Sequence, residues 1–67
     1  MKAEKIISKL NSKGISFSIE HFYNEYNTEL FFTHKGMIYE CDITNGTCNG
    51  FIDEKGKVYS NLKHILK

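Results

Sequence analysis

Residues 15–43 read ISFSIEHFYNEYNTELFFTHKGMIYECDI, and this stretch decides the fold. Apolar and polar side chains alternate along most of it, and a period of two is typical of half-buried β-strands. The alternation predicts strands over 15–23, 28–33 and 37–43, separated by turn residues at 24–27 and 34–36. Because the connections are short, we expect neighbouring strands to pair antiparallel.

The alternation divides the strand side chains between two faces of the sheet. One face is predicted to be buried and collects Ile15, Phe17, Ile19, His21, Tyr23, Leu30, Phe32, Met37, Tyr39, Cys41 and Ile43. The opposite face collects Ser16, Ser18, Glu20, Phe22, Glu29, Phe31, Ile38, Glu40 and Asp42. It is predicted to meet solvent, and it combines carboxylates with large apolar groups.

A helix is predicted before these strands, over residues 2–13. Its apolar residues Ala3, Ile6, Ile7 and Leu10 follow the spacing i, i+3, i+4 and i+7, which places them on one face. Gly14 is suited to the position just beyond the helix. The apolar stripe needs a sheet face to cover, and the predicted buried face provides one.

The residues after 43 predict shorter elements. Asn45-Gly46 and Asn49-Gly50 indicate that 44–50 is either a loop or a tight turn with a bulge. Residues 51–53 and 57–59 predict a last small hairpin, which either covers the exposed face or extends the edge of the sheet. Ser60 or Asn61 is then expected to cap a short helix that buries Leu62, Ile65 and Leu66.

Together these elements predict one small globular α+β domain over residues 1–67. An N-terminal amphipathic helix packs on one face of a 3–5-stranded antiparallel β-meander, and a short C-terminal helix follows. A chain of this length buries only about 60% of the surface of its unfolded state, so a partner or a covalent link would add useful stability.

The charged residues are strongly segregated along the chain. Residues 1–14 have net charge +3, residues 15–54 have −6 and residues 55–67 have +4, although the total is only +1. Charge distribution bears on partners rather than on fold. The longest apolar run is far shorter than a membrane span, and the basic start is not followed by a signal-peptide core, so we expect a cytoplasmic protein without a membrane partner.

The two cysteines, Cys41 and Cys48, flank the predicted turn, so a cross-strand disulfide is conceivable. In the cytosol such a pair would stay reduced. The favoured interpretation is Cys41 as a small core residue and Cys48 as a loop residue. Neither cysteine has the spacing of a zinc site with His21 or His34, so we expect no metal and no cofactor.

Nothing in the chain predicts catalysis. Cys41 and His21 could face each other from the buried side, but substrate would not reach them there and no third orienting group is evident. The chain also lacks the glycine-rich phosphate-binding motifs and the common hydrolase motifs. We therefore expect a protein that is not an enzyme.

The exposed sheet face gives the leading functional hypothesis, which is protein binding. Carboxylates steer a basic partner, and apolar groups provide desolvated anchors. The candidate partner-binding residues are Glu20, Phe22, Glu29, Phe31, Ile38, Glu40 and Asp42. The partner would be a basic or nucleic-acid-binding host protein, with the face acting as a nucleic-acid mimic, and a homodimer is a further possibility.

The alternative hypothesis is nucleic-acid binding by the lysine-rich helices. It uses Lys2, Lys5, Lys9 and Lys13, which form one basic patch with Lys55, Lys57, Lys63 and Lys67 if the two helices lie side by side. Against it stand the absence of arginine and the lack of aromatic residues among these lysines. The simplest interpretation of both surfaces is that they are ordinary solvent-exposed surface without a binding function.

The composition is rich in Lys, Asn and Ile and lacks Pro, Trp and Arg, as expected for a small bacterial, phage or mobile-element protein from an AT-rich genome. In shape and charge alone, the predicted helix followed by three strands resembles phage-encoded inhibitors that mimic nucleic acid. That resemblance implies an inhibitor of a host protein, and no individual residue can be transferred from it.

Overall fold

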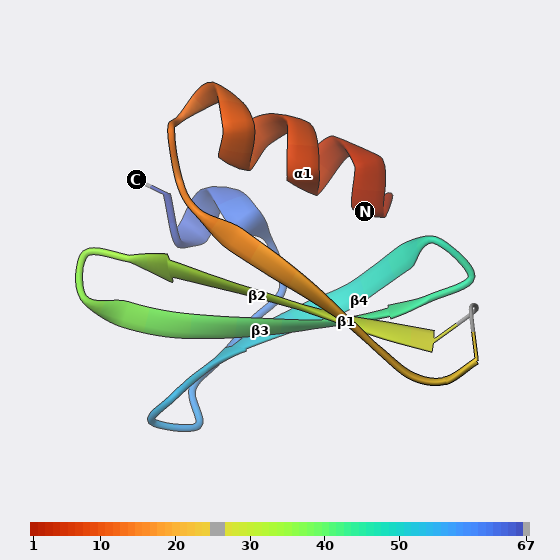
Figure 1. Cartoon of the computed structure of the whole chain (residues 1–67). Helices are drawn as coiled ribbons and strands as arrows, with labels where there is room; N and C mark the ends of the chain where they lie inside the picture. The colour runs from red at the N-terminus through yellow and green to blue at the C-terminus, as the bar shows by residue number, and fades with distance from the viewer. Residues whose placement is uncertain (25–26, 67) are drawn as a thin grey trace.

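A computed structural model describes residues 1–24 and 27–66, with the side chains of 21–24 excluded. Figure 1 shows one helix and a turn of 3₁₀-helix lying on the same side of a twisted sheet. In chain order the elements are α1 (Ala3–Ser12), β1 (Phe17–Asn24), β2 (Asn27–His34), β3 (Met37–Thr44), β4 (Thr47–Asp53), β5 (Val58–Tyr59) and the 3₁₀ turn η1 (Leu62–His64). The predicted α+β class is confirmed.

The sheet is an antiparallel meander with the strand order β1-β2-β3-β4-β5. Lys35 and Gly36 join β2 to β3 with φ of 53° and 79°, and Asn45 and Gly46 join β3 to β4 with φ of 51° and 76°. Two successive residues with positive φ define the two-residue hairpin turn whose twist matches that of the strands. The predicted turn at 24–27 includes residues 25–26, which lie outside the described part of the chain.

The Asn49-Gly50 pair forms a bulge inside β4 instead of a second turn. Cys41 pairs with Phe51 and Ile43 pairs with Cys48, so one extra residue lies in β4 opposite Asp42. Gly50 has φ of +140°, which L-residues with a side chain rarely adopt. Of the two alternatives for 44–50, the tight turn with a bulge is therefore correct. The bulge keeps Cys48 and Phe51 on the same buried face.

The core lies between α1, η1 and one face of the sheet. Ile6 and Leu10 of α1 are fully buried against Leu30, Phe32 and the rest of this face. The full set of buried apolar residues is Ile6, Leu10, Leu30, Phe32, Tyr39, Cys41, Ile43, Cys48, Phe51, Leu62 and Ile65. The predicted inward alternation of β2 and β3 is confirmed, whereas the side chains of His21 and Tyr23 lie outside the described residues.

The start of α1 is fastened to the β3–β4 turn. Ala3 N donates to Gly46 O at 2.8 Å, and Cys48 N donates to Met1 O at 2.8 Å. Lys2 forms an antiparallel bridge with Thr47, so the first two residues lie alongside β4 and the helix begins at Ala3 rather than at residue 2. No side chain caps this helix, and a backbone carbonyl of the turn takes that role for the first helical N–H.

The predicted short C-terminal helix forms only as the 3₁₀ turn η1. Asn61 caps it, since its Oδ1 accepts from Lys63 N at 3.2 Å. A segment this short cannot repay the cost of nucleating an α-helix, so packing of the buried Leu62 and Ile65 determines its shape. Among residues 1–24 and 27–66, no helix is long and apolar enough to cross a membrane.

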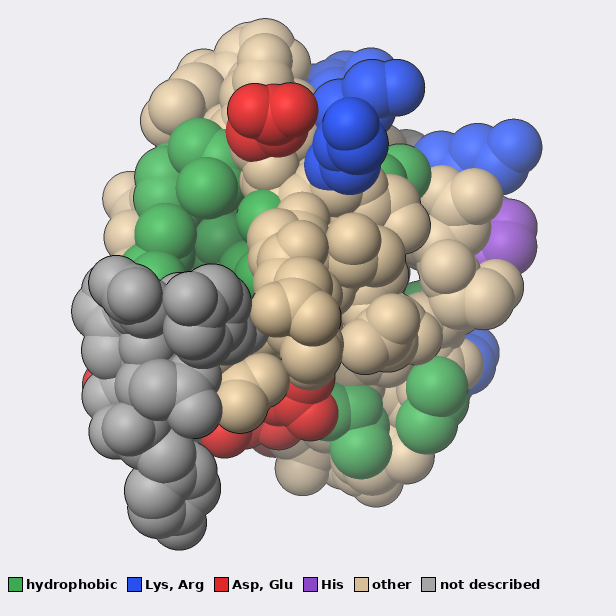
Figure 2. Space-filling model, turned by 90° about the vertical axis from the view of Figure 1, so that its right-hand side faces the viewer, with side chains coloured by type: hydrophobic (Ala, Val, Ile, Leu, Met, Phe, Trp, Pro, Cys, Tyr) green, Lys and Arg blue, Asp and Glu red, His purple; other side chains and the backbone are tan. Residues whose placement is uncertain are grey.

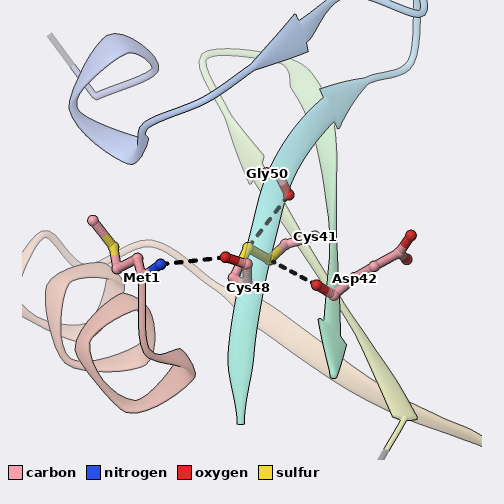
Figure 3. The surroundings of a disulfide bond; sticks show 5 residues. All are labelled: Met1, Cys41, Asp42, Cys48 and Gly50. Carbon is pink, nitrogen blue, oxygen red and sulfur yellow. Dashed lines mark hydrogen bonds between the residues drawn. A yellow bond between two sulfur atoms is a disulfide. The ribbon is translucent and has the colours of Figure 1, made fainter. Parts of the chain in front are cut away.

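Cys41 and Cys48 form a disulfide between β3 and β4, with their Cα atoms 6.2 Å apart (Figure 3). The favoured prediction for Cys48 is wrong, because this residue is buried in a strand rather than placed in a loop. Cys41 is a core residue, as predicted. The amino group of Met1 donates to Cys48 O at 3.3 Å, so the chain terminus, the disulfide and the bulge lie together.

Candidate functional site

The candidate site is the side of the sheet that α1 and η1 leave uncovered, which we call the outer face. Its described side chains include Ser18, Glu20, Glu29, Phe31, Thr33, Ile38, Glu40, Asp42, Ile52 and Val58. In Figure 2 lysines gather near the top of the view with one acidic side chain beside them, and a second acidic group lies lower down. The carboxylates of the outer face thus lie on the side of the sheet away from the lysines of α1, whereas Lys55 and Lys57 lie in the β4–β5 turn of the sheet itself.

Strand register brings the carboxylates of the outer face into neighbouring positions. Glu20 of β1 pairs with Glu29 of β2, and Glu29 pairs with Asp42 of β3. Glu40 lies two residues from Asp42 on β3 and reaches Glu29 diagonally, as cross-strand neighbours do. Carboxylate oxygens of Glu29, Glu40 and Asp42 all lie within 4.8 Å of one another.

This crowding raises the pKa of Glu29 to about 7. The largest cause is a hydrogen bond with the Glu40 carboxyl, which the protonated form of Glu29 donates. Burial and the negative charges of Glu40, Asp42 and Glu20 act in the same direction. Near neutral pH, Glu29 therefore exchanges its proton while its neighbours surround it with negative charge.

A row of polar and apolar side chains crosses the whole sheet beside these carboxylates. In register from β1 to β5 it consists of Ser18, Phe31, Glu40, Ile52 and Val58. Ile52 is 38% exposed and Val58 is 70% exposed, while Ile38, adjacent to the row, is 48% exposed. Exposed apolar groups that are contiguous and edged by charge mark interaction surfaces more often than scattered ones do.

Two shallow hollows lie on either side of the Glu40–Ile52 cross-strand pair. The first hollow, of about 300 Å³, is bounded by Asp42 and Val58. The second hollow, of about 210 Å³, is bounded by Phe31 and Ile38. Glu40 and Ile52 line both hollows. A partner would therefore meet two partly apolar depressions with a carboxylate between them. A partner surface that carries a lysine or arginine between two apolar side chains would complement this arrangement, with its cation at Glu40 and its apolar groups in the two hollows.

The structure brings together six of the seven predicted partner-binding residues on the outer face: Glu20, Glu29, Phe31, Ile38, Glu40 and Asp42. The side chain of Phe22 lies outside the described residues. Sequence reasoning missed Ile52 and Val58, because it left open whether 51–59 covers this face. The segment extends the sheet edge instead, and the alternation of Phe51, Ile52 and Asp53 is the signal that indicates it.

Neither cysteine is available for the metal and catalytic roles considered above, because each sulfur is bonded to the other. The side chain of His21 lies outside the described residues. Within the described part of the chain, Glu29, Glu40 and Asp42 are the set whose oxygens are close enough to share one cation. Exposed acidic groups are common without an ion, and no second feature of the described residues points to a ligand here, so we assign them no metal.

The crowded carboxylates have a measurable effect on stability. The folded protein keeps a proton on Glu29 between pH 4.5 and about 7, whereas the unfolded chain has released it, so stability falls as pH rises through this range. Glu29→Gln removes this dependence and should raise the melting temperature at pH 8 by about 2–4 °C, since the repulsion on this open face amounts to roughly 0.5 kcal/mol. Melting curves at pH 5 and pH 8 measure this change in stability, with Glu4→Gln on α1 as the control. If Glu29→Gln loses stability between these pH values as steeply as the wild type does, the crowding has no such effect.

Comparison with protein-family models, with curated proteins and with solved structures finds no match to this chain. Its function must therefore be inferred from its own surfaces.

Proposed function

We propose that this protein is a non-enzymatic interaction module that binds a basic, partly apolar protein surface through the outer face. The observation that supports this most is the row in which Phe31, Glu40 and Ile52 lie side by side on adjacent strands. The exposed isoleucines supply area that gains free energy on burial, at about 25 cal/mol per Å². The surrounding carboxylates select for a cationic partner and speed its association.

The arrangement of the carboxylates also supports mimicry of nucleic acid. Glu20, Glu29 and Asp42 follow one another across three adjacent strands, which are spaced by about 4.8 Å. A duplex advances about 3.4 Å per phosphate along its axis, so both surfaces place anionic groups within a few ångströms of one another. The partner we infer is a host protein that binds nucleic acid, and the protein would act on it as an inhibitor encoded by a phage or mobile element.

The test is charge reversal on the outer face. The variant Glu20→Lys/Glu40→Lys/Asp42→Lys should lose its partner, because like charges then oppose a basic surface. Its melting temperature should stay within a few degrees of the wild-type value, since these side chains lie outside the core. The measurement is capture of proteins from a nuclease-treated lysate of the source cell, with the partner's affinity then determined at two salt concentrations.

Two further variants make this test specific. Glu4→Lys/Asn11→Lys/Ser12→Lys adds comparable positive charge to exposed positions of α1 and should still capture the partner. Ile38→Ser/Ile52→Ser keeps every carboxylate and should also lose the partner, because the apolar anchors are gone. Equal binding by the wild type and the charge-reversed variant would refute the proposal.

A further inference from the structure

The proposed function uses the outer face alone and leaves a second surface, on the opposite side of the molecule, without a role. A groove of about 800 Å³ runs along α1, between the helix and the 3₁₀ turn η1. Lys5, Ser8, Lys9 and Ser12 line it from the helix, and Asn61 and Lys63 line it from the C-terminal segment. The groove therefore joins two parts of the chain that lie far apart in the sequence.

The groove is basic. Lys5, Lys9 and Lys63 are all exposed, and among the described residues that line the groove Glu4 is the one carboxylate. Figure 2 shows lysines near the top of the view, with one acidic side chain beside them and another acidic group lower down. Opposed charges on two faces give the protein a dipole that orients an anionic ligand towards the groove.

The dimensions of the groove suit a phosphate backbone. The lining positions from Glu4 to Ser12 cover eight helical steps, or about 12 Å at 1.5 Å per residue. A duplex advances about 3.4 Å per phosphate along its axis, and the strand itself follows a longer path, so the groove spans fewer than four phosphates of one strand. Three lysines line this length.

The lining also favours phosphate over an acidic protein. Protein interfaces depend on apolar and aromatic anchors, whereas the residues described around this groove include no aromatic side chain. Met1 and the buried Leu62 are apolar and Glu4 is acidic, whereas the other described residues of the lining are neutral polar or cationic; more of the lining surface is apolar than polar. Lysines and a serine hydroxyl are sufficient to hold phosphate oxygens, and without stacking groups they read no base.

We propose that the groove between α1 and η1 binds the phosphate backbone of nucleic acid without sequence preference. Lys5 and Lys9 contact phosphates from one wall of the groove, and Lys63 contacts them from the other. The Ser8 hydroxyl donates to a phosphate oxygen, whereas the Ser12 hydroxyl already donates to Lys9 O at 2.8 Å. Of the lysines in the alternative hypothesis, Lys5, Lys9 and Lys63 line this groove, whereas Lys2 and Lys13 lie outside it.

The test is fluorescence anisotropy with a labelled 12-nucleotide oligo-dT and a labelled mixed-sequence duplex, at 20–200 mM NaCl. Lys9→Gln/Lys63→Gln removes one lysine from each wall. It should weaken binding of oligo-dT about tenfold at low salt and make the slope of log K against log salt shallower by about 1.4, or 0.7 for each lost contact. Duplexes of different sequence should bind equally well.

The matched control is Lys55→Gln/Lys57→Gln, which removes the same charge from the β4–β5 turn, outside the groove. It should bind oligo-dT within about twofold of wild type. The proposal is overturned if wild type binds neither probe at 20 mM NaCl, or if the control variant weakens binding as much as the groove variant does. Displacement of the oligo-dT by polyglutamate at equal charge concentration would also overturn it, because the groove would then accept acidic protein equally well.

Discussion

Replacing Asp53 with alanine lowers the melting temperature by more than about 10 °C, a large loss for a polar side chain. Asp53 is 7% exposed at the end of β4 and faces the core side of the sheet. Its Oδ1 accepts from Lys55 N and Lys57 N, both at 2.9 Å, and its Oδ2 accepts from the Tyr59 hydroxyl at 3.1 Å. One carboxylate thus holds the turn that brings β5 back to β4.

The same contacts make this turn sensitive to acid. The pKa of Asp53 is held below its ordinary value, chiefly by the N–H of Lys57 and also by that of Lys55 and by Tyr59. A lowered pKa means that the stabilisation is complete above the ordinary pKa of an aspartate and is lost as pH falls below about 4. We therefore expect wild type to lose stability in this range and Asp53→Asn to lose less.

Two variants separate the contributions of Asp53. Tyr59→Phe removes one of the three hydrogen bonds and should cost less than half of the Asp53→Ala effect, and Asp53→Asn keeps the size of the side chain and should fall between them. Thermal melts followed by circular dichroism at pH 7 provide the comparison. An Asp53→Ala protein that melts within 3 °C of wild type would show that the turn is held by other contacts.

Reduction of the Cys41–Cys48 disulfide gives the second large effect, a loss of about 2 kcal/mol or roughly 10 °C in melting temperature. The bond closes a loop with a sequence separation of 7, and the expected loss is that of a short loop, because the stabilisation grows with loop length. The fold should survive, since both sulfurs already have carbonyl oxygens nearby. Cys48 Sγ lies 3.3 Å from Gly50 O and Cys41 Sγ lies 3.9 Å from Asp42 O (Figure 3).

Melting curves with and without a phosphine reductant measure this effect. The control is Cys41→Ala/Cys48→Ala, whose melting temperature should not respond to the reductant. Equal melting temperatures of oxidised and reduced wild type would contradict the expected stabilisation. Because disulfides persist in oxidising compartments and thiols in reducing ones, the same chain would have different stability in each.

The sequence pattern predicted the elements that depend on local rules. Period-two alternation assigned the buried side chains of β2 and β3 correctly, and Lys35-Gly36 and Asn45-Gly46 both form tight hairpin turns. The apolar stripe of α1 predicted that Ile6 and Leu10 are buried. In each case the residues on which the prediction rests belong to the predicted element itself or lie within a few positions of it in the sequence.

The errors concern tertiary contacts. Asn49-Gly50 has the composition of a turn, but pairing with β3 makes it a bulge, and the sequence left both possibilities open. Residues 1 and 2 lie along β4 because the backbone of Cys48 and Thr47 is available there, which no local pattern indicates. For the candidate site, six outward residues were predictable from alternation, whereas Ile52 and Val58 required knowledge of the sheet edge.

The most direct test of the outer face is a ¹⁵N NMR titration of the protein with the partner that it captures. We expect the amide signals of Phe31, Ile38, Glu40 and Ile52 to shift or broaden, because they line the two hollows of the outer face. The signals of Lys5, Ser8 and Lys9 on α1 should stay in place. Changes confined to α1, with the outer-face signals unaltered, would contradict the proposed function.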